Sequence, residues 1–225
     1  MIKLSHSPSP EAITKLKSLE EKRVQCLKNG QELPDSVKKG YRHHTVKAAI
    51  RQETCDKCAY CESKVTHTYP GDVEHIIPKS VRPDLMLDFY NLTFSCSACN
   101  NNKRDYYSED APIIDPYKDD PESHIFACGP LIMYRPGDTV GYVTKQKLDL
   151  NRMSLVERRK ERLESVTRLV DQVVRTRNKA HRQVLLEELY KECDKCMEYS
   201  FVVRAYIQMV LKGMGEVGTA EAIQM

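Results

Sequence analysis

The stretch from Cys58 to Lys103 decides the fold. It contains, in order, Cys58-Ala-Tyr-Cys61, Asp72-Val-Glu-His-Ile-Ile-Pro78, Asn91-Leu92 and Cys96-Ser-Ala-Cys99-Asn-Asn-Asn-Lys103. Two C-x-x-C pairs therefore bracket a Glu-His step and an Asn-Leu step. The cysteine spacing is typical of a structural zinc site, and the polar residues between the pairs are of the kinds that bind a hard cation and activate water.

The N-terminal side of this stretch has three cysteines for two zinc positions, because Cys55-Asp-Lys-Cys58-Ala-Tyr-Cys61 contains two overlapping C-x-x-C pairs. We favour Cys58 and Cys61, since the chain then passes directly into the next strand. Cys55 would then be a spare thiol. The alternative, that Cys55 replaces Cys58 or Cys61 as a zinc ligand, stays open. With Cys96 and Cys99 they would form a closed tetrahedron of four thiolates, so the zinc would be structural. Replacing one ligand is expected to unfold the core.

A second Cys-Asp-Lys-Cys sequence occurs at Cys193 and Cys196. It lacks another cysteine pair that could complete a zinc site, and both positions fall on the apolar stripe of a predicted helix. We therefore interpret both residues as part of the helical core.

The composition leaves the function open. The chain has 225 residues, 40% apolar and 30% charged, with a formal net charge of +3 and nine cysteines. This length suits one compact domain with appendages, or two small ones. The net charge alone is too small to indicate nucleic-acid binding. No apolar run approaches a membrane span and no apolar leader follows Met1, so a cytoplasmic protein without a membrane partner is expected.

The regions around the cysteine stretch are predicted to be mainly helical. Residues 1–54 form an N-terminal helical segment, with one amphipathic helix over 10–29 that begins at Ser9-Pro10. Residues 111–150 form an extended or β arm, including an apolar run at 140–143. Residues 151–225 form a C-terminal pair of long helices, the second spanning 179–212 without a break.

Residues 55–110 form the core. After the Pro70-Gly71 turn, the residues at 73, 75 and 77 alternate in the sequence with those at 72, 74 and 76, namely Val73, His75 and Ile77 with Asp72, Glu74 and Ile76. This alternation predicts a strand. A second strand is expected at 92–95 and a short helix from Cys96 onward. Together with its flanks, the chain is predicted to be an α+β protein.

These residues resemble the HNH endonuclease family, whose zinc-stapled ββα-metal core has the same order of elements. The resemblance extends to the HNH partner proteins of Septu and certain retron anti-phage systems. It is carried by Met1-Ile-Lys-Leu, Tyr41-Arg-His43, Val73-Glu-His75, Ile114-Asp-Pro116 with Asp120-Pro121, and Leu148-Asp-Leu-Asn151-Arg.

The resemblance implies a role for each residue of the inner motif. His75 would be the general base, and Asn91 would orient the loop that carries it. Glu74 and Asn100 would bind one catalytic cation, Mg²⁺ or Mn²⁺, through oxygen atoms. Lys103 would place a positive charge against the substrate phosphate, and we add Lys79 and Arg82 as substrate-binding candidates from the loop between the strands.

The leading hypothesis is a metal-dependent endonuclease that hydrolyses phosphodiester bonds and works with an ATPase partner in phage defence. A retron reverse transcriptase with its RNA and DNA would be a further partner in a retron system. The alternative is a zinc-stabilised adaptor that binds nucleic acid or the ATPase without cutting. The motif leaves open whether the substrate is DNA or RNA, because such a centre acts on the backbone and does not read bases.

Overall fold

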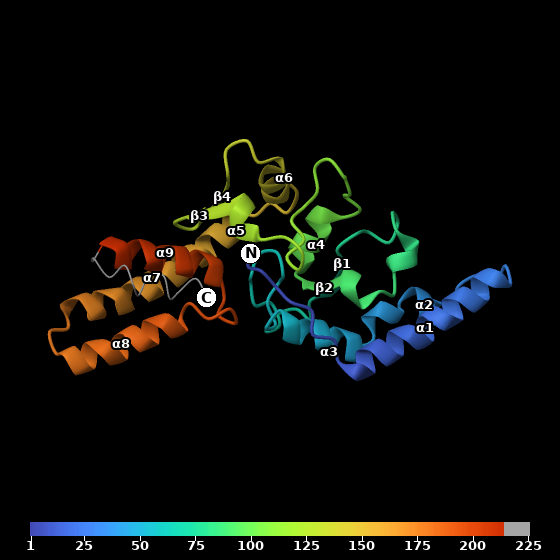
Figure 1. The fold of residues 1–225 in the computed structure, drawn as a ribbon, viewed down its shortest axis with the longest axis horizontal. Helices are drawn as coiled ribbons and strands as arrows, with labels where there is room; N and C mark the ends of the chain where they lie inside the picture. Colours follow the sequence, from blue (N-terminus) through green and yellow to red (C-terminus); the bar gives the residue numbers. More distant parts are fainter. Residues whose placement is uncertain (214–225) are drawn as a thin grey trace.

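Helices and two small sheets make up residues 1–213, which are the residues described by the computed structural model. Figure 1 shows the N-terminal helices and the C-terminal helices at opposite ends of the longest dimension, with the strands between them. Each sheet has two antiparallel strands. The predicted α+β class is confirmed. No helix within this range is both long and apolar enough to cross a bilayer.

The N-terminal segment packs against one strand of the core. It contains α1 (Pro10–Lys28), α2 (Asp35–Lys38) and α3 (His44–Glu53). The predicted start of α1 is confirmed, because the Ser9 side chain accepts a hydrogen bond from the Ala12 backbone N–H. The apolar faces of α1 and α3 are buried in one cluster with Leu92 and Phe94. This helical layer therefore supports the strand Leu92–Ser95.

The core has the predicted strand, strand, helix order. Strand β1 (Asp72–His75) pairs antiparallel with β2 (Leu92–Ser95), and α4 (Ser97–Lys103) follows. In this register Glu74 lies opposite Thr93 and His75 opposite Leu92. Strand β1 is shorter than predicted. Beyond its end the pairing continues only through the Ile76 N–H, which donates to the Asn91 carbonyl.

The predicted arm is only partly extended. It contains α5 (Pro121–His124), a hairpin of β3 (Ile125–Cys128) and β4 (Leu131–Tyr134), and α6 (Thr139–Lys147). The prediction of extended or β structure is wrong at 140–143, because Asp138 caps a helix there by accepting from the Gly141 N–H. A Cβ at Gly141 would lie 2.3 Å from the His124 carbonyl oxygen, so the small residue serves close packing of α6 on the hairpin.

Residues 151–213 of the C-terminal region contain three helices, whereas the sequence predicted two. They are α7 (Met153–Arg175), α8 (Lys179–Lys191) and α9 (Ser200–Gly213), and their apolar sides form one core cluster. The continuous helix predicted over 179–212 is wrong. Between α8 and α9 the Asp194 side chain accepts from the Cys196 N–H, and Tyr199 has a φ of 56°. Positions 214–225 of the predicted C-terminal region lie outside the described residues.

A disulfide between Cys55 and Cys196 joins the turn between α8 and α9 to the segment between α3 and β1. The interpretations of Cys55 as a spare thiol and of Cys196 as a helical core residue are therefore wrong. Cys193 is buried in the helical cluster, as predicted. The bond joins positions 141 residues apart, which no local sequence pattern indicates.

We expect Cys196→Ser to lower the free energy of unfolding of the oxidised protein by up to about 5 kcal/mol, because the cross-link closes a long loop in the unfolded chain. Denaturant unfolding with and without a phosphine reductant measures this effect. The reductant should remove the difference between variant and wild type. Cys128→Ser, at an exposed free cysteine, is the matched control and should change neither curve. A deficit that persists under full reduction would contradict the prediction.

Candidate metal and nuclease site

Four cysteines converge where the core is closed. The segment after α3 supplies Cys58 and Cys61, and the start of α4 supplies Cys96 and Cys99. Their sulfur atoms all lie within 4.8 Å of one another and all four residues are buried. No other group of three or more His, Cys, Asp or Glu in residues 1–213 has a geometry that could hold a metal ion. The structure brings Cys58 and Cys61, and not Cys55, together with Cys96 and Cys99.

The spacing of the sulfur atoms fits zinc. A tetrahedron with Zn–S distances of about 2.3 Å places its sulfur atoms about 3.8 Å apart, and the Cys61 and Cys96 sulfurs are 3.8 Å apart. The neighbouring thiols lower the pKa of Cys61 well below its ordinary value, whereas burial raises the pKa of Cys58. Four sulfur ligands fill a tetrahedral site completely, so zinc here would be structural.

Backbone hydrogen bonds connect this cluster to the strands. The Ala59 N–H donates to the Phe94 carbonyl on β2, and the Cys58 N–H donates to the Ser63 carbonyl. Cys96 precedes α4 and its sulfur accepts from the Cys99 N–H at 3.4 Å. The cluster thus joins the segment at Cys58 and Cys61, which precedes β1, to the chain that connects β2 with the first turn of α4.

A buried ion pair joins β1 to the end of α4. Lys103 Nζ donates to Glu74 Oε1 at 2.7 Å and to the His75 carbonyl at 2.8 Å. Both side chains are nearly inaccessible, with Lys103 2% and Glu74 8% exposed. Burial raises the pKa of Glu74, and the charge of Lys103 opposes that shift. Lys103 is thus engaged inside the protein, and its predicted contact with a substrate phosphate stays a prediction.

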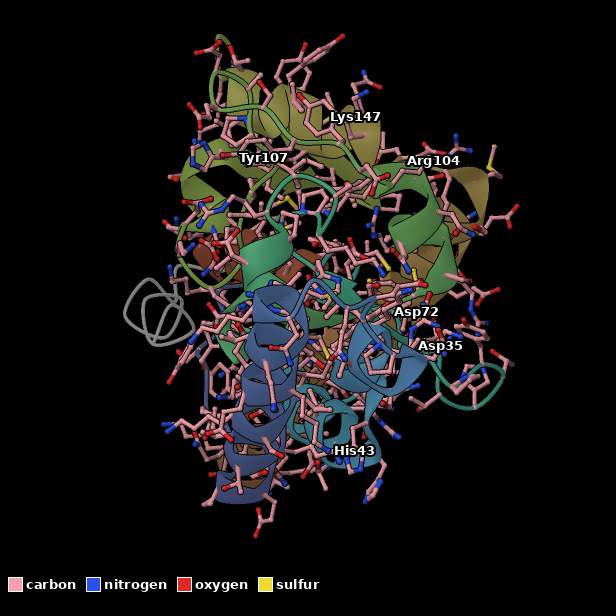
Figure 2. All side chains as sticks on the ribbon, turned by 90° about the vertical axis from the view of Figure 1, so that its right-hand side faces the viewer. Asp35, His43, Asp72, Arg104, Tyr107 and Lys147 are labelled. Carbon is pink, nitrogen blue, oxygen red and sulfur yellow. A yellow bond between two sulfur atoms is a disulfide. The ribbon has the colours of Figure 1, made fainter. Side chains whose placement is uncertain are left out.

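The other carboxylate on this strand face was missed by the sequence reasoning. Asp72 lies two residues before Glu74, so alternation places both on one face of β1. Asn100 Nδ2 donates to Asp72 Oδ2 at 3.0 Å, and the Tyr69 hydroxyl donates to Asp72 Oδ1 at 2.7 Å. Asp72 is labelled in Figure 2. Its spacing of two from Glu74 was the available signal.

His75 faces the opposite side of the strand. Its Nε2 lies 3.0 Å from the Met86 carbonyl. A carbonyl only accepts, so Nε2 carries the proton and Nδ1 is the basic nitrogen of the neutral ring. Burial lowers the pKa of His75 to about 4, with further lowering by Lys79, Lys103 and Arg42, while the Met86 carbonyl opposes the shift. The imidazole is therefore neutral near pH 7, the state a general base requires.

The ring of Tyr41 packs against His75 edge to face, with centroids 4.5 Å apart. Arg42 Nε and Lys79 Nζ donate to the Tyr41 hydroxyl at 3.1 and 3.3 Å. Sequence reasoning used Tyr41 only as part of a family motif and gave it no role. Its position, far from the cysteine stretch in sequence, hid this contact.

Asn91 holds the loop that follows His75. Its Oδ1 accepts from the Ile77 N–H at 2.8 Å, and its Nδ2 donates to the Ile77 and Leu85 carbonyls at 2.9 and 3.4 Å. These are side-chain hydrogen bonds of the type predicted for this position. They bridge the two ends of the loop from which Met86 reaches His75.

The two substrate-binding candidates of that loop have different surroundings. Lys79 lies at the Tyr41 hydroxyl, with its ammonium 5.0 Å from the ring centroid. Arg82 forms an exposed two-bond ion pair with Asp84. The structure thus brings Lys79 to the His75 side of the site, whereas the charge of Arg82 is offset by Asp84. Contact of either residue with a substrate stays a prediction.

Comparison with known proteins agrees with this geometry. The HNH endonuclease family model matches residues 58–105. The Septu protein PtuB of Bacillus thuringiensis is 33% identical over 122 residues, which cover 53% of this chain and 45% of that protein. The Septu protein PtuB of Bacillus mycoides (strain KBAB4) is 26% identical, covering 53% of this chain and 51% of the relative.

This chain spans about half the length of the curated relatives it matches. The predicted resemblance to HNH endonucleases and to Septu proteins is confirmed by these matches. Residues 58–105 are therefore similar to HNH endonucleases, within a chain that is similar to Septu PtuB proteins.

Proposed function

We propose that the protein is a metal-dependent nuclease that hydrolyses phosphodiester bonds of nucleic acid. The observation that carries this proposal is His75, which is held neutral with Nδ1 as its basic atom next to a strand face with two carboxylates. The HNH family match over the same segment supports it.

Glu74, Asn100 and Asp72 are the residues that would hold the catalytic cation. Carboxylate and amide oxygens suit Mg²⁺ or Mn²⁺. Asn100 uses its Nδ2 on Asp72, so its Oδ1 is the atom left to bind a cation. Lys103 donates to Glu74 Oε1, so Oε2 would be the oxygen of this carboxylate that binds the cation. A cation bound there would stabilise the negative charge that develops on the phosphate and the departing oxygen.

The protein's own groups would supply the remaining steps. His75 Nδ1 would accept the proton of the attacking water, while the Met86 carbonyl fixes the ring through Nε2. Asn91 would keep the loop that carries Met86 in place. Lys103, at the end of α4, would orient the Glu74 carboxylate through its hydrogen bond. Lys79 would attract the phosphate backbone on the His75 side of the strand.

We also propose that this activity serves phage defence together with a partner protein, an ATPase in our hypothesis. The similarity to Septu proteins supports a defence role. The arm and C-terminal helices are the proposed docking region. A retron partner remains a sequence-based prediction. The competing adaptor hypothesis is decided by the cleavage experiment below.

His75→Ala and Asn100→Ala should each reduce cleavage of a plasmid or RNA panel in Mg²⁺ or Mn²⁺ by about 10²-fold or more, because they remove the proposed base and a proposed metal ligand. The measurement is the initial rate with purified protein, alone and with the purified partner. His67→Ala, at an exposed histidine, is the matched control and should keep full activity. Cleavage that survives both site variants would refute the mechanism, and absence of any wild-type cleavage with the partner present would favour the adaptor.

Asp72→Ala should raise the Mg²⁺ concentration needed for half-maximal cleavage, because it removes one carboxylate beside Asn100. A titration of Mg²⁺ from micromolar to tens of millimolar measures this change. Asp110→Ala, at an exposed aspartate of the loop after α4, should leave the titration unchanged. An unaltered Mg²⁺ requirement in the Asp72 variant would exclude Asp72 from the cation site.

Cys99→Ser should abolish the stoichiometric zinc and unfold the core, because zinc binding in such sites contributes about 10–16 kcal/mol, as much as a domain's whole stability. Elemental analysis and circular dichroism give the two readouts. Cys26→Ser, at a half-buried free cysteine, should retain one zinc and the wild-type spectrum. A Cys99 variant that is folded without metal would contradict the prediction, because folding of the core would then not require zinc.

A further inference from the structure

The guanidinium of Arg152 lies directly against the cysteine cluster. Its Nη1 is 3.6 Å from the Cys99 sulfur, and its Nη2 is 3.7 Å from the Cys96 sulfur and 3.8 Å from the Cys61 sulfur. These are N–H···S hydrogen-bond distances. Arg152 is at least 53 positions away from each of these cysteines in the chain. One side chain from outside the HNH segment therefore touches three of the four zinc-ligand candidates.

The backbone around Arg152 is built to aim it there. Arg152 immediately precedes α7, and its Nη1 also donates to the Leu148 and Asp149 carbonyls at 3.3 and 3.2 Å. Asp149 has a φ of 47°, which turns the chain sharply before α7. These contacts restrict the guanidinium, so it is positioned before any metal binds.

The neighbouring residue anchors this turn to the arm. Asn151 Oδ1 accepts from the Ile132 N–H at 2.8 Å, and its Nδ2 donates to the Ile132 carbonyl at 2.9 Å. This pair of bonds extends the β3–β4 hairpin with a side chain. The position of Arg152 is therefore fixed from both the hairpin and the helix.

The negative charge of a zinc-bound cluster would favour a cation at the position of Arg152. Four thiolates around Zn²⁺ carry a net charge of −2, and burying such a charge is unfavourable unless it is offset. A planar guanidinium presents several N–H donors in a fixed geometry, so it can contact three sulfurs at once. Hydrogen bonds from residues behind the ligands commonly tune a metal site and its affinity.

We propose that Arg152 is a positioning residue of the zinc site, which retains the metal by donating hydrogen bonds and positive charge to the ligands Cys61, Cys96 and Cys99. The C-terminal helical region thereby contributes directly to the stability of the nuclease domain. This proposal rests on zinc in the cysteine cluster and not on cleavage activity, so it can fail independently of the proposed function.

The test is the rate of zinc release from the 225-residue protein to an excess of a chelating dye. Arg152→Ala and Arg152→Gln should lose zinc roughly 10- to 100-fold faster than wild type, the range typical of residues behind metal ligands. Arg158→Ala is the matched control, because Arg158 lies on α7, is exposed and forms an ion pair with Glu161. Its release rate should equal that of wild type.

A second readout separates a role at the sulfurs from a general effect on folding. Replacing zinc with Co²⁺ gives a thiolate-to-metal charge-transfer band, whose energy should shift in Arg152→Gln because the sulfurs lose the positive charge and the planar set of guanidinium N–H donors. Wild-type release rates and an unshifted band in Arg152→Gln would overturn the proposal. If Arg152→Ala does not fold, Arg152→Gln is judged by the same two criteria.

Discussion

The closure of the four-cysteine cluster is the constraint on which the rest of the structure depends. Strands β1 and β2 have four residues each, and an isolated two-stranded sheet of this size is marginally stable at best in water. The cluster fixes the chain before β1 to the start of α4, while α1 and α3 cover β2 from the other side. The positions of Glu74, His75 and Asn100 follow from these two supports.

The candidate site is divided between the two faces of β1 as a consequence. Glu74 and Asp72 face α4, where Lys103 and Asn100 meet them. His75 faces the loop and Tyr41. Strand alternation makes this division unavoidable while the strand is regular. The strand ends at His75, so the regular alternation also ends there.

The cysteine motif and the ββα order could be predicted because they depend on local spacing and period. The two C-x-x-C ligand pairs and the cap at Ser9 belong to this class, whereas the role of Asn91 was predicted from the family resemblance. The Cys55–Cys196 disulfide, the Lys103–Glu74 pair and the Tyr41–His75 contact join distant positions, and no period in the chain encodes them. The helix break before Ser200 escaped notice because apolar residues keep helical spacing across it.

The Lys103–Glu74 pair links the stability of the core to its chemistry. Removing one partner of a buried ion pair costs about 3–5 kcal/mol, since the other charge is left uncompensated. Lys103 donates to Glu74 Oε1 and is also held by the His75 carbonyl. The same lysine therefore joins β1 to the end of α4 and restricts the orientation of the Glu74 carboxylate, so a contact that stabilises the core also positions a candidate site residue.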